Sequence, residues 1–95
     1  MGRRTLTFIG FIFVSLLEPA AAQYSGPESV EYDPQNDRYY VSNTGSQLIR
    51  QRDQSGTVTT LVNVGDSPYG LELLHDTLFA CVGGAIKGYS TSDGA

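Results

Sequence analysis

The chain is short and acidic, with 95 residues and a net charge of −4 at pH 7. Its few cations are scattered rather than gathered in a stripe, which excludes the electrostatic footprint of nucleic-acid binding and of attachment to anionic membranes. Small exported domains commonly rely on disulfides, but Cys81 is the one cysteine in the sequence, so an internal bridge is excluded.

The chain begins with the pattern of a secretory signal peptide. Arg3 and Arg4 give a basic start, residues 6–17 form an apolar run, and small residues predict cleavage between Ala22 and Gln23. The apolar run is shorter than the roughly 20 residues of a membrane span, so no stable membrane anchor is expected. We therefore expect a secreted or periplasmic protein, exported by the general route or, given the arginine pair, by the twin-arginine route.

After this leader, short apolar segments alternate with clusters of Gly, Pro, Asp, Asn and Ser, a pattern typical of antiparallel strands and tight turns. The first half contains four expected strands, at residues 29–32, 38–43, 47–52 and 57–62. The second half contains three, at residues 70–74, 77–82 and 85–90. A fourth strand of the second half is expected to begin at residue 95. The predicted fold is all-β, with about one and three-quarter four-stranded antiparallel meanders.

The two halves repeat one another with a small drift in spacing. Pro27 recurs as Pro68, 41 positions later, and the segment that begins with Tyr39 recurs 39 positions later. A period of roughly 40 residues made of short strands is the signature of β-propeller blades. The predicted division is therefore a signal peptide at 1–22, a first blade at 23–66 and a second, incomplete blade at 67–95.

Two blades leave apolar sheet faces without a neighbour, because each repeat covers its faces only by stacking on others. The uncovered faces are expected to carry Tyr39, Val41, Leu78 and Ala80, or the opposite set of side chains. Three readings are open: the chain is the front part of a longer protein, it closes a ring by self-association, or it comes from a decayed gene. Either remaining blades or further copies of the chain are thus expected to complete the fold.

The chain resembles the first two blades of the gluconolactonase and regucalcin-like six-bladed propellers, and strictosidine synthase-like and NHL propellers share much of the pattern. The residues that resemble the first blade are 26–33, 38–43 and 53–56, and those that resemble the next blade are 68–72, 77–81 and 86–89. The resemblance covers essentially all of the chain after the leader. It implies that the chain is a fragment of a six-bladed propeller.

What the resemblance implies for function is calcium-dependent hydrolysis of lactones or related esters. Glu28 matches the position of the family's first metal-binding Glu, with a surface Glu near a blade junction as the alternative. Tyr69 stands where many of these lactonases place an Asn, a departure that favours a non-catalytic module for a lactone or sugar-type ligand or for a protein. The other calcium ligands and the acid and base residues would lie in further blades. No catalytic residue is assigned, and the chain alone is expected to be inactive.

Three other groups of residues have simpler explanations than a site. Asp33, Asn36 and Asp37 could belong to a calcium loop, but the flanking strands favour a hairpin turn. His75 and Asp76 could form a catalytic triad with one of several serines. However, His75 falls in the corresponding turn of the second half, and the sequence has no nucleophile elbow. Cys81 alternates with its neighbours on a strand and is expected to be buried, with pairing between molecules as the alternative.

Overall fold

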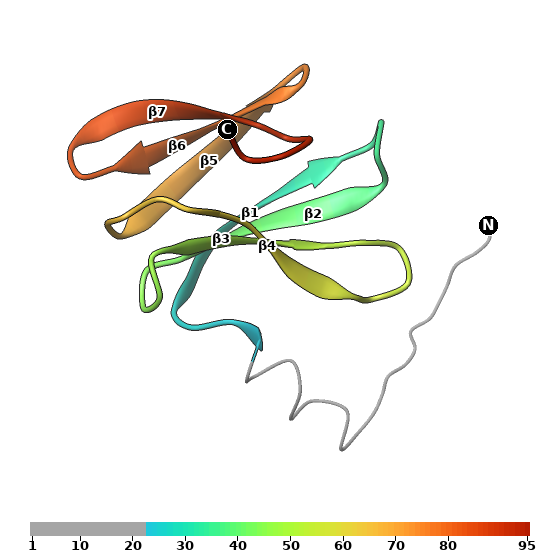
Figure 1. The fold of residues 1–95 in the computed structure, drawn as a ribbon, viewed down its shortest axis with the longest axis horizontal. Coiled ribbons are helices and arrows are strands. Elements are labelled where there is room, and N and C mark those ends of the chain that lie inside the picture. Colours follow the sequence, from blue (N-terminus) through green and yellow to red (C-terminus); the bar gives the residue numbers. More distant parts are fainter. Residues whose placement is uncertain (1–22) are drawn as a thin grey trace.

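The computed structural model describes residues 23–95; the predicted signal peptide, with Ala22 at its end, lies outside them. Within the described part, seven strands form two antiparallel sheets, which confirms the all-β prediction (Figure 1). The strands are β1 (Pro27–Asp33), β2 (Arg38–Asn43), β3 (Leu48–Arg52), β4 (Val58–Asn63), β5 (Pro68–Leu74), β6 (Thr77–Val82) and β7 (Ala85–Ser90). No helix among residues 23–95 has the length and apolar character that crossing a membrane requires.

Both sheets are simple meanders in which consecutive strands pair. The first sheet has the order β1-β2-β3-β4 and the second has the order β5-β6-β7. Strands β2, β6 and β7 have the bounds that the sequence predicts, whereas β1 and β5 each begin two residues earlier, at Pro27 and Pro68. A proline is tolerated as the first residue of a strand because no ladder hydrogen bond needs its missing N–H there.

The pairing of the strands repeats from one sheet to the other. Val30 pairs with Val41 in the first sheet, and the equivalent residues Leu71 and Ala80 pair in the second. The first strand of each sheet also carries a bulge near its start, between Pro27 and Ser29 in β1 and between Pro68 and Leu71 in β5. The sequence repeat is therefore a repeat of register, with Glu28 and Tyr69 at equivalent bulges.

The turns account for the drift in spacing between the repeats. Residues 34–37 connect β1 to β2, whereas only His75 and Asp76 connect β5 to β6. Residues 44–47 likewise connect β2 to β3, and Gly83 and Gly84 alone connect β6 to β7. These two glycines have φ values of 59° and 79°. A two-residue turn of type I′ requires positive φ at both positions, which glycine adopts without steric cost.

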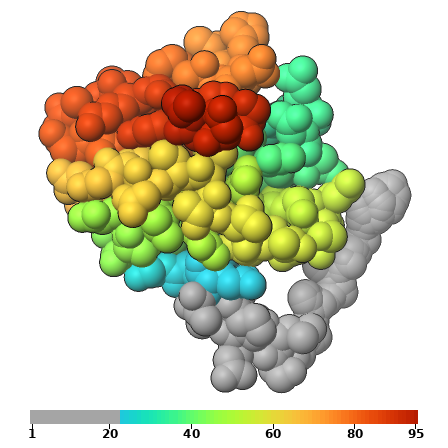
Figure 2. Space-filling model, viewed as in Figure 1, coloured from blue at the N-terminus to red at the C-terminus, as the bar shows by residue number. Residues whose placement is uncertain are grey.

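The core lies between the sheets and is made from two unlike faces. We call the face with Val30, Tyr39 and their equivalents Leu71 and Leu78 the front of each sheet, and the opposite face the back. The back of the first sheet packs on the front of the second, with β1 and β2 lying against β5. The buried apolar core comprises Tyr40, Ile49, Leu61, Leu71, Leu78, Ala80 and Val82. In the space-filling view the dark red end of the chain, after β7, lies against the yellow segment around residue 60 (Figure 2).

The front of the first sheet and the back of the second have no covering element among residues 23–95. Val30 and Tyr39 are exposed on the former, and Ile86 is exposed on the latter. Cys81 shares this second open face, so the prediction that it is buried is wrong. The reason is that β6 has apolar side chains on both faces, and the core takes Leu78, Ala80 and Val82 instead.

Replacing Leu78 with alanine tests the core. Leu78 is fully buried between the sheets, so Leu78→Ala should lower the free energy of unfolding by about 2–5 kcal/mol. The matched control is Leu74→Ala in the same sheet, where the side chain is 56% exposed and the expected change is below about 1 kcal/mol. Urea denaturation followed by circular dichroism measures both. Equal losses for the two variants would contradict the assigned core.

Candidate functional site

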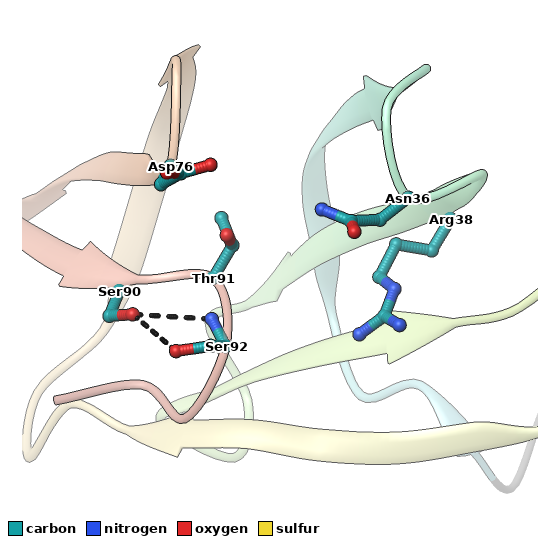
Figure 3. Close-up of a pocket in the computed structure, with 6 residues that line it drawn as sticks. All are labelled: Asn36, Arg38, Asp76, Ser90, Thr91 and Ser92. Atoms are coloured by element: carbon teal, nitrogen blue, oxygen red, sulfur yellow. Dashed lines mark hydrogen bonds between the residues drawn. The ribbon is translucent and has the colours of Figure 1, made fainter.

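A polar cleft of about 500 Å³ separates the two sheets at the end that holds the β1–β2 and β5–β6 turns. Figure 3 shows its two walls: Asn36 and Arg38 of the first sheet face Asp76 and the segment after β7 across an open space. The lining residues are Asn36, Arg38, Asp76, Ser90, Thr91 and Ser92. All of them carry a hydrogen-bonding side chain, so the cleft suits a hydrophilic ligand.

Arg38 supplies the positive charge of the cleft. Its Nη1 donates a hydrogen bond to Oε1 of Gln51 at 3.0 Å, whereas its Nε is buried and has no partner. The same side chain borders an adjoining polar recess of about 190 Å³, together with Gln51, Asp53, Thr57 and Thr59. The buried Nε is out of a ligand's reach, but the bond to Gln51 uses only one N–H of the Nη groups, and the others can donate to a carboxylate or phosphate ligand.

The opposite wall is held in place by short-range hydrogen bonds. The Thr91 amide donates to the carbonyl oxygen of Asp76 at 2.9 Å, which ties the segment after β7 to the β5–β6 turn. The Ser90 and Ser92 hydroxyls lie 2.8 Å apart, and the Ser92 amide donates to the Ser90 hydroxyl at 3.2 Å. This wall therefore presents two hydroxyl groups held against each other, beside a turn that carries the Asp76 carboxylate.

A buried hydrogen-bond network lies beside the cleft. The carboxylate of Asp33 accepts hydrogen bonds from the Asn36 side-chain amide at 2.8 Å and from the Tyr40 hydroxyl at 2.7 Å, and it also accepts from the Gln35 and Asn36 backbone amides. The network thus fixes the β1–β2 turn, and with it Asn36 on one wall of the cleft, to the buried side of β2.

The network shifts the pKa values of its two ionisable members in opposite directions. Burial opposes ionisation of Asp33, but the hydrogen bonds from Asn36, Tyr40 and the backbone outweigh it, and the pKa of Asp33 is lowered. Burial, with the hydrogen bond to Asp33, raises the pKa of Tyr40 to about 12. A charged Asp33 and a neutral Tyr40 are therefore the forms that the folded state favours.

The candidate calcium ligand Glu28 lies away from this cleft. It is exposed, occupies the bulge at the start of β1, and lines a shallow recess of about 210 Å³ with Pro27, Ser29, Val30 and Val41. Tyr69 occupies the equivalent bulge of β5 and is also exposed. Residues 23–95 bring no three His, Cys, Asp or Glu side chains close enough together to hold a metal ion. Glu28 alone falls short of the six to eight oxygen ligands that calcium takes.

The turn interpretation holds for the other residues singled out in the sequence. Asp33 caps the β1–β2 turn, Asp37 ends it with a φ of 52°, and His75 begins the β5–β6 turn with a φ of 56°. The cleft could not be predicted from the sequence, because Asn36, Asp76 and Ser92 belong to three turns that are distant in sequence. The one available signal was the repeat itself, which predicts that the first two turns lie at the same end of neighbouring sheets.

The comparisons with known proteins add no name to this geometry. A scan against protein-family models and a search of the curated proteins both found no match to the chain. The resemblance to gluconolactonase-like propellers therefore rests on the sequence of the two repeats alone.

Acid should weaken the fold through Asp33. Because its pKa is lower in the folded state, its stabilising effect is complete above the unfolded value of about 3.9 and is lost as the pH falls through the folded value. Asp33→Asn should cost about 1–3 kcal/mol at pH 7 and flatten this acid dependence. The matched control is Asp37→Asn in the same turn, which should keep it. Urea denaturation from pH 7 to pH 2 is the measurement, and identical profiles for wild type and Asp33→Asn would contradict the network.

Alkali should weaken the fold through Tyr40. Its pKa is raised in the folded state, so its stabilising effect is complete below the unfolded value of about 10 and is lost as the pH rises through about 12. Tyr40→Phe removes a hydrogen bond to a carboxylate and should cost about 1.5–3 kcal/mol at neutral pH. Tyr69→Phe, at an exposed position, is the control. If both variants unfold alike, the Tyr40 hydroxyl has no such role.

Proposed function

We propose that the chain provides two blades of an exported, gluconolactonase-like β-propeller and that it binds a small polar ligand in the cleft between them. Three features support the propeller assignment. The strand registers repeat, the bulges at Glu28 and Tyr69 are equivalent, and the first strand of each sheet, β1 and β5, lies where the two sheets meet. Contact between the sheets is concentrated on β1, β2 and β5, as expected where blades meet near a common axis.

The polar cleft is the observation that carries the ligand-binding proposal. Its volume of about 500 Å³ falls in the range of roughly 300–1,000 Å³ typical of small-molecule sites. It lies where two repeats meet, so both contribute side chains to it. The walls are held by the hydrogen bonds of Asp33 and Thr91, and a ligand would therefore meet donors and acceptors that are already in place.

The chemistry of the walls favours a sugar-type ligand with an acidic group. Arg38 would bind the carboxylate, since its side chain lines the cleft and the bond to Gln51 uses only one of the N–H donors on its Nη groups. Asp76, Asn36 and the hydroxyls of Ser90 and Ser92 would receive the ligand's hydroxyl groups, because they offer both donors and acceptors. On this proposal the module binds and does not itself carry out a reaction.

Arg38→Gln tests the binding proposal, with D-glucuronate as the acidic probe and D-glucose as the neutral one. The variant should weaken D-glucuronate binding at least about tenfold, because it removes a charged hydrogen-bond partner, and change D-glucose binding little. Arg52→Gln removes the same charge outside the cleft and is the matched control. Isothermal titration calorimetry at low salt measures both. Equal weakening by the two variants, or no binding of either sugar, would contradict the proposal.

Calcium-dependent hydrolysis is the second candidate, favoured by the exposed bulge position of Glu28. Since residues 23–95 do not bring two more acidic side chains to Glu28, a complete set of carboxylate ligands would need residues from outside them. In the protein purified from its native host, Glu28→Gln should then lower calcium affinity at least about tenfold and reduce lactone hydrolysis. Glu72→Gln, at an exposed position of β5, is the control. Unchanged calcium affinity in Glu28→Gln would exclude the metal role.

A further inference from the structure

The two sheets stack head to tail, and this leaves one open face at each end of the described residues. The back of the first sheet covers the front of the second, so the contact joins two different surfaces. The front of the first sheet and the back of the second are the same two kinds of surface, still uncovered. A contact of this heterologous kind can repeat from one molecule to the next.

The contact between the sheets shows what such surfaces require. The Ser42 hydroxyl of β2 donates to the carbonyl oxygen of Tyr69 at 2.6 Å, and the Leu71 amide donates to the Ser29 hydroxyl at 3.3 Å. Around these polar contacts, Tyr40 and Ile49 are buried together with side chains from the front of the second sheet. The back of a sheet thus receives the first strand of the next sheet.

The open front of the first sheet has the side chains to make the same contact. Val30 is 60% exposed, Tyr32 44% and Tyr39 42%. By register these residues are equivalent to Leu71, Leu73 and Leu78, which lie in or against the core on the second sheet. The rings of Tyr32 and Tyr39 have centroids 4.9 Å apart, so they form one continuous aromatic surface. Arg50 also lies on this face, because it pairs with Val41.

The open back of the second sheet offers a matching apolar groove. The groove measures about 240 Å³ and is lined on this face by Gly70, Glu72, Phe79, Cys81 and Ile86. Leu71 and Ala80, whose side chains are buried on the front, also border it. Ile86, equivalent to the fully buried Ile49, is 74% exposed here. Glu72 is the charged side chain of the groove, and its sign is opposite to that of Arg50 on the open front.

We propose that the open front of one molecule docks on the open back of a second copy of this chain. Register then places Val30 and Tyr39 of one copy in the groove around Phe79 and Ile86 of the next. It also places Cys81, the equivalent of Ser42, next to the backbone of Glu28, the equivalent of Tyr69. Gly70 replaces Ser29 and lacks its hydroxyl, so this contact is weaker than the one within the chain. The result is a head-to-tail ring of three or more copies or an open stack.

Two single substitutions test the contact without disturbing the core. Ile86→Glu alters one open face and Val30→Glu the other, at side chains that are largely exposed. In sedimentation velocity over a concentration series, residues 23–95 should associate, into one discrete oligomer if the ring closes or into a series that grows with concentration if the stack is open, and each variant alone should be monomeric. A mixture of the two variants should give a 1:1 heterodimer, because each retains one intact face. Gln54→Glu, in the exposed β3–β4 turn, is the charge control and should associate like the wild type.

A cysteine pair tests the register. In Glu28→Cys, oxidation should link residue 28 of one copy to Cys81 of the next and give a ladder of reducible oligomers. The double variant Glu28→Cys, Cys81→Ser should not give this ladder, and Ser55→Cys should give far less of it. A wild-type monomer at every concentration would overturn the proposal, and so would association that survives both Ile86→Glu and Val30→Glu. The inference rests on the paired faces and not on the ligand cleft, so either proposal can fail alone.

Discussion

The contact between the back of the first sheet and the front of the second holds residues 23–95 together. Each sheet is a thin meander with three or four strands, and such a sheet is stable only when it buries an apolar face. Tyr40 and Ile49 of the first sheet and Leu78 of the second meet in a single core. Because neither sheet has a core of its own, the positions of the turns, the cleft and the exposed faces all depend on this one contact.

The cleft follows from where the sheets touch and where they do not. β1 and β2 lie against β5, and the outer parts of the sheets meet less closely. At the end of the molecule that holds the β1–β2 and β5–β6 turns, the gap is bordered by polar side chains. One of them, Asn36, is held by the buried Asp33, which also accepts a hydrogen bond from Tyr40. A buried carboxylate at this point is tolerated because four hydrogen bonds compensate for its lost hydration.

The sequence predicted the strands well because their signals are local. Turn clusters and β-branched or aromatic runs placed β2, β6 and β7 at their observed bounds. It could not decide which face each strand buries, since Tyr39 and Tyr40, or Leu78 and Phe79, are apolar neighbours on opposite faces. Burial of Cys81 was mispredicted for this reason. The cleft and the Asp33 network depend on contacts between distant turns, which no local pattern specifies.

The unequal turns give the cleft its asymmetry. Had the repeats kept turns of equal length, the β1–β2 connection would have two residues, as at His75 and Asp76, and no position for Asn36. The Asn36 side chain borders the cleft and donates a hydrogen bond to Asp33. The two extra residues of the β1–β2 turn therefore add a side chain to the cleft and also the hydrogen bond that holds it in place. Lengthening a surface turn costs little conformational entropy. Such turns are therefore where stacked repeats can diverge in specificity while their shared framework of strands stays constant.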